Sequence, residues 1–144
     1  MPPQVGIIDV VAFIVKDPAR AAQRVVVSPS LEGPLIAEFV AQSRHRPDHY
    51  LLRPGKLLAR SDWFGGKYSS VFATPEKMME YFRRNPVNLV IWNERPGANL
   101  APHARLMSEM LRGYPLAWHK VLELGPAGRS ASSWTVYEYD MPPR

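Results

Sequence analysis

Polar side chains at the ends of three short apolar runs are the residues of this sequence that most readily suggest binding chemistry. Hydroxyl, carboxylate, guanidinium and amide groups can bind a phosphorylated or nucleotide ligand when they meet at one edge of a parallel sheet. We therefore take as candidate ligand-binding residues the polar groups that follow or end the runs at 24–28, 49–53 and 87–94, namely Ser28, Ser30, Glu32, Arg53, Asn93 and Glu94.

The segment after the first run, SPSLEGP, matches known phosphate-binding turns only weakly. It has one glycine and no lysine followed by serine or threonine, and its prolines lack the backbone N–H that would bind a phosphate. It therefore fits neither the P-loop nor the dinucleotide-binding fingerprint. The simpler interpretation is that its serines cap the helix that follows.

No pattern of residues indicates catalysis or metal binding. Glu32 and Glu94 are candidates for a carboxylate pair, but neither has a histidine or a second acid beside it. The histidines at 45, 49, 103 and 119 lack metal-binding spacing, and the serine-rich loop GPAGRSASSW lacks a G-x-S-x-G motif. We expect no catalytic residue, no metal and no cofactor, and each candidate residue is better explained as structural.

The stretch LLARSDWFGGKY at 57–68 is too apolar for a free loop. One interpretation is an aromatic lid, in which Trp63 and Tyr68 approach each other across the Gly-Gly turn and cover a ligand. Arg53, Arg60 and Asp62 would then make polar contacts with that ligand. The other interpretation, which we favour, is a structured crossover that plugs the core.

Apolar periodicity and prolines divide the chain into alternating helices and strands. The apolar stripe at 7–15 predicts a helix, although its β-branched residues keep a strand as the alternative. Thr74 and Pro75 are the expected N-cap and first residue of a helix that ends before Pro86. The remaining predicted elements are strands at 24–28, 49–53 and 87–94, helices from Pro34 and over 101–113, and a closing hairpin of strands at 117–125 and 133–141.

This order of elements predicts an α/β fold, with residues 1–144 as a single domain. Strands that alternate with helices usually form parallel sheets covered by those helices. We therefore expect a three-layer, mostly parallel (Rossmann-like) sheet with helices on both faces and a C-terminal antiparallel hairpin. The candidate residues meet at one edge of the sheet if the three predicted strands run side by side in the same direction. These strands are 24–28, 49–53 and 87–92.

The composition favours a soluble globular protein. The chain has 144 residues, no cysteine and a net charge of +5, so disulfides and thiolate zinc sites are excluded. No apolar run reaches the about 18 to 20 residues of a membrane span, and the apolar start lacks the features of a signal peptide. Because the basic residues are scattered and no recognition motif accompanies Arg44-His45-Arg46, a solvated basic face explains the charge better than nucleic-acid binding.

Three segments between residues 7 and 95 resemble a known family. They are the turn and helix E-G-x-x-I-A-E from Glu32, the segment RHRPDHY before the second strand, and L-A-x-S-x-W-x-G-x-x-Y from Leu58 to Tyr68. They are similar to the soluble domain that follows the membrane helices of some bacterial polytopic glycosyltransferases, related to protein mannosyltransferases and lipid A aminoarabinose transferases. The resemblance carries over no catalytic residue, because that family's catalytic acids lie between its membrane helices. It implies that Arg53, Trp63 and Tyr68 belong to one structural unit.

Two functions are compatible with these residues and with the resemblance. The first is a soluble, non-catalytic accessory or binding domain, associated with a membrane glycosyltransferase or an anionic lipid-linked glycan of the cell envelope. The alternative is a small enzyme or sensor that binds a phosphorylated or nucleotide ligand at the carboxyl ends of the strands. If the resemblance holds, the domain lies on the extracytoplasmic face of the membrane; otherwise it is cytoplasmic.

Overall fold

The structure is a computed structural model, and it describes residues 6–17, 24–29, 31–43, 50–52, 54, 59–60, 69–85, 87–94, 100–125 and 133–140. Statements about the fold and the sites concern this part of the chain. Its helices are α1 (Ile7–Val15), α3 (Glu32–Gln42), α5 (Pro75–Arg84) and α6 (Pro102–Gly113). Its strands are β1 (Arg24–Val26), β2 (Tyr50–Leu52), β3 (Ala59–Arg60), β4 (Ser69–Ser70), β5 (Leu89–Glu94), β6 (Trp118–Leu124) and β7 (Ser133–Tyr139).

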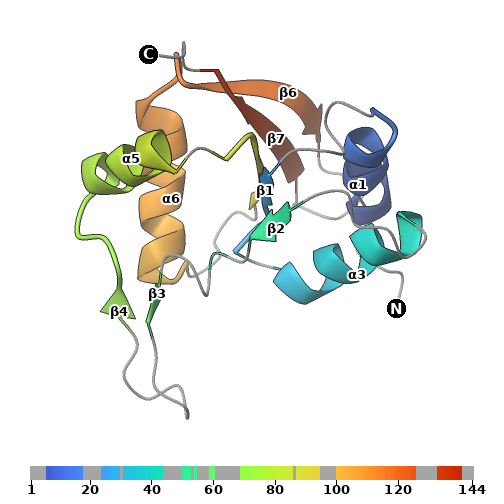
Figure 1. Cartoon of the computed structure of the whole chain (residues 1–144), viewed down its shortest axis with the longest axis horizontal. Coiled ribbons are helices and arrows are strands. Elements are labelled where there is room, and N and C mark those ends of the chain that lie inside the picture. Colours follow the sequence, from blue (N-terminus) through green and yellow to red (C-terminus); the bar gives the residue numbers. More distant parts are fainter. Residues whose placement is uncertain are drawn as a thin grey trace.

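A five-stranded sheet in the order β2-β1-β5-β7-β6 forms the centre of the fold (Figure 1). β1 runs parallel to both β2 and β5, so the three strands predicted to lie side by side in one direction do so. β6 and β7 form the predicted antiparallel hairpin. The α/β class is therefore confirmed, and the elements follow in the predicted order.

The sheet is mixed, and the predicted parallel majority is not confirmed. The hairpin lies at one edge of the sheet, as expected. Strand β7 lies between β5 and the edge strand β6. It pairs antiparallel with β5 along its length, from Leu89 opposite Glu138 to Glu94 opposite Ser133. Two of the four pairings in the sheet are thus antiparallel, and this topology does not establish the finer Rossmann-like, three-layer description.

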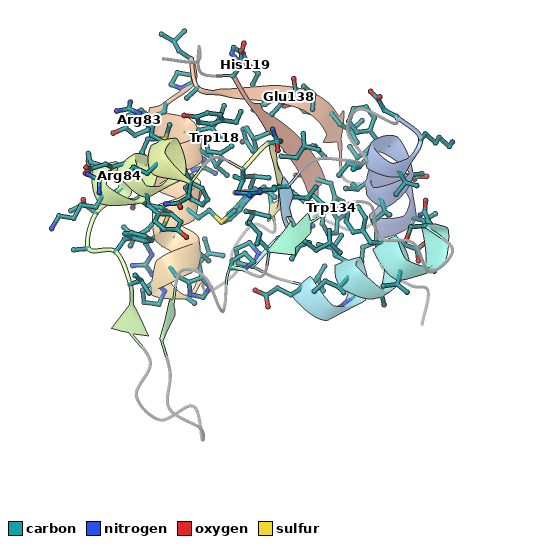
Figure 2. The ribbon with its side chains drawn as sticks, in the orientation of Figure 1. Arg83, Arg84, Trp118, His119, Trp134 and Glu138 are labelled. Carbon is teal, nitrogen blue, oxygen red and sulfur yellow. The ribbon has the colours of Figure 1, made fainter. Side chains whose placement is uncertain are left out.

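Alternate residues of the central strands face two separate apolar clusters. Val25 and Val27 pack with α1 and α3 on one side of the sheet, whereas Val26 packs with α5 and α6 on the other. Figure 2 shows the same division in the hairpin, where Trp118 lies on the α5–α6 side and Trp134 on the α1–α3 side. Burial of both faces explains why the central strands read as continuous apolar runs.

A local signal in the sequence accounts for the start of α5, whereas the N-caps of α1, α3 and α6 make no side-chain hydrogen bond. Residues 7–15 form a helix, as favoured, and the Thr74 hydroxyl accepts a hydrogen bond from the Lys77 N–H at 3.2 Å, as expected of an N-cap. α3 begins at Glu32 rather than at the predicted Pro34. Proline is tolerated in the first turn of a helix because the N–H groups there have no partner within the helix, so Pro34 does not mark the start.

Two short strands flank the aromatic stretch that follows β2. β3 and β4 pair antiparallel, with Ala59 opposite Ser70 and Arg60 opposite Ser69, and form a ribbon separate from the main sheet (Figure 1). This ribbon was not predicted from the sequence, because strands of two residues carry no periodic pattern. Asp62, Trp63 and Tyr68 lie outside the described residues, so the choice between a lid and a crossover stays a prediction.

Candidate functional site

The parallel strands create a topological switch point between β1 and β5. The chain leaves β1 for α3 on one face of the sheet and continues to β2, whereas it leaves β5 for α6 on the opposite face. Adjacent strands whose connections depart in opposite directions leave a crevice outside their carboxyl ends, where ligands of open α/β sheets bind. This rule places a candidate binding site outside the carboxyl ends of β1 and β5.

A crevice of about 240 Å³ lies at this switch point. We call it the strand-end crevice. It is formed by the residues that follow β1, the end of β5 and the start of α6. Its lining consists of Ser28, Pro29, Trp92, Asn93, Leu100, Ala101, His103 and Ala104. Two of the predicted site residues, Ser28 and Asn93, therefore come together here from positions 65 residues apart.

Hydrogen bonds fix these two side chains. The Ser28 hydroxyl accepts a bond from the backbone N–H of Asn93 at 3.3 Å, so it extends the β1–β5 pairing beyond the last paired residues. The Asn93 side-chain amide donates to the carbonyl of Ser133 in β7 at 3.2 Å. Both side chains are buried, so the crevice presents a hydroxyl and an amide that are held in place by the sheet.

His103 is the third polar group of the crevice, and it is also buried. Burial lowers the pKa of His103, because the charged imidazolium is disfavoured away from water, while the negative charge of Glu32 opposes this by raising the pKa. The imidazole is therefore neutral at pH 7. A neutral imidazole has one N–H donor and one acceptor, so it can hydrogen-bond to a ligand of either type.

Leu31 stands between the crevice and α3 with a left-handed backbone, at φ +68°. It is the one non-glycine residue of the described part with a positive φ. Such a conformation costs about 1 to 3 kcal/mol, and residues that adopt it cluster at active sites, ligand clamps and switch regions. Leu31 lies in the connection from Ser28 to Glu32. This connection leads from β1 to α3 and begins at the strand-end crevice.

The structure separates the predicted site residues into three groups. Ser28 and Asn93 line the crevice, and Glu32 acts on it through the pKa of His103. Glu94 lies on the other face of β5, where it lines a different cavity. The rest of the predicted site lies outside the described residues, namely Ser30, Arg53, Asp62, Trp63 and Tyr68.

His103 was missed as a site residue because histidines were judged only by metal-ligand spacing. A different signal was available: the dipeptide Pro102-His103 opens a helix that directly follows the third parallel strand. The first turn of such a helix lies at the carboxyl ends of the strands, so its polar residues belong to the same rim as Asn93.

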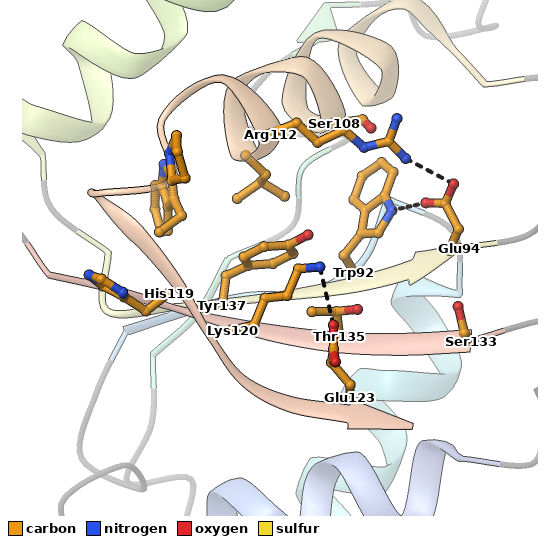
Figure 3. Close-up of a pocket in the computed structure, with 13 residues that line it drawn as sticks. Trp92, Glu94, Ser108, Arg112, His119, Lys120, Glu123, Ser133, Thr135 and Tyr137 are labelled. Atoms are coloured by element: carbon orange, nitrogen blue, oxygen red, sulfur yellow. Dashed lines mark hydrogen bonds and ion pairs between the residues drawn. The ribbon is translucent and has the colours of Figure 1, made fainter. Parts of the chain in front are cut away.

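A second and larger cavity of about 700 Å³ lies on the α5–α6 face of the sheet, beside the strand-end crevice (Figure 3). We call it the α6–hairpin cleft. Trp92 lines both cavities and so forms the wall between them. The cleft is lined by Trp92 and Glu94 of β5, by Ser108, Leu111 and Arg112 of α6, by Pro115, and by Trp118, His119, Lys120, Glu123, Ser133, Thr135 and Tyr137 of the hairpin.

Two ion pairs line this cleft, one between α6 and β5 and the other within β6. Arg112 reaches from α6 over Trp92 to Glu94, with 3.1 Å between Nη2 and Oε1, and the Lys120 ammonium lies 3.1 Å from the Glu123 carboxylate on β6 (Figure 3). The second carboxylate oxygen of Glu94 accepts a bond of 2.6 Å from the Trp92 indole N–H. Both acids of the cleft are thus already paired with a base.

A β-bulge explains why Lys120 and Glu123 face the same cavity. Side chains of a regular strand alternate between faces, so residues three apart point to opposite sides. Here Lys120 lies opposite Tyr137 and Leu122 opposite Val136, which leaves Val121 as the extra residue. The bulge shifts the alternation by one, and both charged groups consequently point into the cleft.

Metal ligation finds no support in the described residues, where no group of three or more His, Asp and Glu could hold an ion. Nor does this part of the chain contain a helix with the length and hydrophobicity needed to cross a bilayer. Comparison with known proteins gave no match, either to a family model or to a curated protein. The resemblance to the glycosyltransferase-associated domain therefore stays a prediction.

Proposed function

We propose that the chain is a non-catalytic binding domain that holds the anionic end of a ligand in the strand-end crevice. The observation that carries the proposal is the meeting of Ser28, Asn93 and His103 in one crevice at the β1–β5 switch point. Following the sequence resemblance, we further propose that the domain is accessory to a membrane glycosyltransferase, and that its ligand is a phosphorylated, lipid-linked sugar.

The start of α6 supports an anionic group as the part of the ligand that enters. The N-terminal end of a helix carries a partial positive charge and N–H groups without partners in the helix. α6 has Pro102 in its first turn, no acidic residue there, and no side-chain hydrogen bond at its N-cap, Ala101. Together with the hydroxyl and amide of the crevice, this end supplies donors to a phosphate or carboxylate.

The size of the crevice supports a single group rather than a whole nucleotide. Pockets that enclose small-molecule ligands usually measure about 300 to 1,000 Å³, and the crevice is smaller, at about 240 Å³. A phosphoryl group fits such a space, with the rest of the ligand outside. The alternative is an enzyme or sensor for a nucleotide. A nucleotide is larger than this crevice, so residues beyond the described ones would have to enclose the rest of it.

A thermal-shift comparison tests this proposal. Glucose 1-phosphate, inorganic phosphate, glucose and AMP are each added to the protein, and a ligand at about 100 times its dissociation constant adds ~2.7 kcal/mol of stability. We expect both phosphates to raise the Tm by more than glucose does. A response to AMP alone would favour the nucleotide alternative, and a flat response to all four would contradict both.

A pair of histidine variants locates the effect. His103→Gln replaces the imidazole in the crevice with an amide and changes the donor and acceptor positions, whereas His119→Gln alters an exposed histidine that the crevice does not include. We expect the first variant to lose most of the phosphate response and the second to keep it. Equal responses of the two variants would place the phosphate elsewhere.

A further inference from the structure

The α6–hairpin cleft has a chemistry different from that of the strand-end crevice. We infer that it binds an uncharged, hydroxyl-rich ligand, that is, a short segment of carbohydrate. The inference comes from the arrangement of charges in the cleft and does not depend on the proposed function. It assigns a second binding site, on the opposite side of Trp92 from the first.

The space in the cleft arises from the fold. α5 and α6 pack on β1 and β5, while the hairpin extends the sheet beyond α6 and ends in the edge strand β6. Part of the hairpin's face therefore has no covering helix, and α6 forms one wall of the cleft that results (Figure 3). Its volume of about 700 Å³ lies within the range of ligand pockets, about 300 to 1,000 Å³.

The charges in this space are balanced around one phenol. Arg112 pairs with Glu94, and Lys120 pairs with Glu123. All four charges act on the hydroxyl of Tyr137, the two cations in one direction and the two carboxylates in the other. Tyr137 thus lines a cleft with several strong hydrogen-bonding groups, in which each cation has an acidic partner, and the lining residue His119 lies 3.4 Å from Asp140.

Balanced pairs of this kind select against ionic ligands. An anion would be attracted by Arg112 and Lys120 but repelled by the carboxylate beside each of them. A cation would be attracted by the two carboxylates but repelled by Arg112 and Lys120. An uncharged hydroxyl donates to a carboxylate and accepts from a guanidinium or ammonium group, so it can bind without separating either pair. Ligands with many hydroxyls gain from each of these groups.

Further polar groups of the cleft add to this set, among them Ser108 and His119. Ser133 and Thr135 of β7 offer hydroxyls that both donate and accept. Burial raises the pKa of Tyr137, so its phenol stays protonated and can donate at neutral pH. Trp92 and Trp118 are 4% and 2% exposed, so they supply the edges of rings rather than open faces, and recognition depends on hydrogen bonds.

A protein partner fits this lining less well. The exposed large apolar residues of the described part are Ile8, Val40, Val71 and Leu116, and none of them lines the cleft. An amphipathic helix would need an apolar groove there. The bulge that turns both Lys120 and Glu123 inward increases the polarity of the cleft, which is the opposite of what helix docking requires.

The experiment compares trisaccharides that differ in charge. The uncharged probes are maltotriose, cellotriose, mannotriose and triacetylchitotriose, the anionic probe is trigalacturonate, and the cationic probe is chitotriose. Binding is followed by the amide chemical shifts of the full chain in NMR titrations. We expect at least one uncharged trisaccharide to shift amides of β6 and β7, and to bind about tenfold or more tightly than both charged probes, since a hydrogen bond to a charged group is worth about that factor.

Variants distinguish specific binding from surface adhesion. Glu123→Gln leaves Lys120 unpaired in the cleft, so we expect weaker binding of the uncharged trisaccharide and stronger binding of trigalacturonate. Glu80→Gln is the matched control, because Glu80 forms an exposed ion pair with Arg84 on α5, outside the cleft. His103→Gln should leave trisaccharide binding unchanged, which separates this site from the strand-end crevice.

Any of five results would overturn the inference. The first three are the absence of shifts with every uncharged probe, equal or tighter binding of a charged probe to the unmodified protein, and shifts that fall outside the hairpin and α6. An unchanged charge preference in Glu123→Gln would overturn it as well. A loss of trisaccharide binding in Glu80→Gln would have the same consequence.

Discussion

The indole N–H of Trp92 donates a hydrogen bond of 2.6 Å to the carboxylate of Glu94, two residues further along β5. Both side chains lie on the same face of the strand because strand residues alternate between faces. The bond fixes the indole as the wall between the strand-end crevice and the α6–hairpin cleft. It also holds Glu94 where Arg112 of α6 can reach it.

Loss of the Glu94 carboxylate should destabilise the protein around Trp92. Glu94→Leu removes the acceptor of the Trp92 N–H and the partner of Arg112, and we expect the free energy of unfolding to fall by about 1 to 3 kcal/mol. Urea unfolding followed by tryptophan fluorescence measures the change. Arg112→Leu is the control, since it removes only the exposed ion pair, worth about 0 to 1 kcal/mol. Equal losses in the two variants would assign no role to the indole bond.

Among the glycines of the described residues, Gly6 has the least room for an added methyl group. Its φ is +107°, and a Cβ there would lie 2.5 Å from Cδ1 of Trp134. We expect Gly6→Ala to lower the free energy of unfolding by about 1 to 3 kcal/mol or more, from backbone strain and displacement of a buried ring. Gly33→Ala is the matched control, because a Cβ at that helical position meets no atom within 4 Å. That variant should be neutral or stabilising by up to about 1 kcal/mol.

The buried indole of Trp118 has an unusual acceptor, the sulfur of Met79, at 3.3 Å. Met79→Leu keeps the apolar volume but leaves the indole N–H without this acceptor, so we expect a loss of about 1 to 3 kcal/mol in unfolding free energy. Met78→Leu, at the neighbouring buried position, should cost less than about 1.5 kcal/mol. If the two variants are equally stable, the sulfur contact contributes nothing.

The buried His103 should make stability depend on pH. Its pKa is lowered from the ordinary value of 6.5 by burial, so below that pH the unfolded chain binds a proton more readily than the folded one. The free energy of unfolding should therefore decrease as the pH falls through 6.5. The decrease stops once the pH is below the pKa of the folded state.

Two variants test the pH dependence. His103→Gln should reduce the loss of stability below pH 6.5, because it removes the group that titrates. Glu32→Gln removes the charge that raises the pKa of His103, so the loss should continue to lower pH than in the unmodified protein. Urea unfolding across the pH range gives both curves. Identical curves for the unmodified protein and His103→Gln would contradict the assignment.

The elements of this fold could be predicted where local chemistry determines them. Thr74 with Pro75 marked the start of α5, and the continuous apolar runs marked the parallel strands. The position of β7 could not be predicted in this way, because pairing with β5 depends on contacts between segments that are far apart in the sequence. The register shift at Val121 could not be predicted either, because it depends on how β6 pairs with β7.

The site was predictable only in part. The meeting of Ser28 and Asn93 in one crevice could be predicted, because the ends of neighbouring parallel strands lie together. The α6–hairpin cleft was missed, although its polar side shows in the alternation of Ser133, Thr135 and Tyr137 along β7. We treated the hairpin as an edge of the fold, and the space beside α6 depends on how far the sheet extends beyond that helix.

The most direct test of the central claim is an NMR titration of the full chain with glucose 1-phosphate, with glucose as the control. The account predicts shifts at Ser28, Asn93 and the first turn of α6 with the phosphate, no shifts there with glucose, and loss of these shifts in His103→Gln. Shifts that avoid these residues, or the same shifts with glucose, would contradict the proposal that the strand-end crevice holds the anionic end of a ligand.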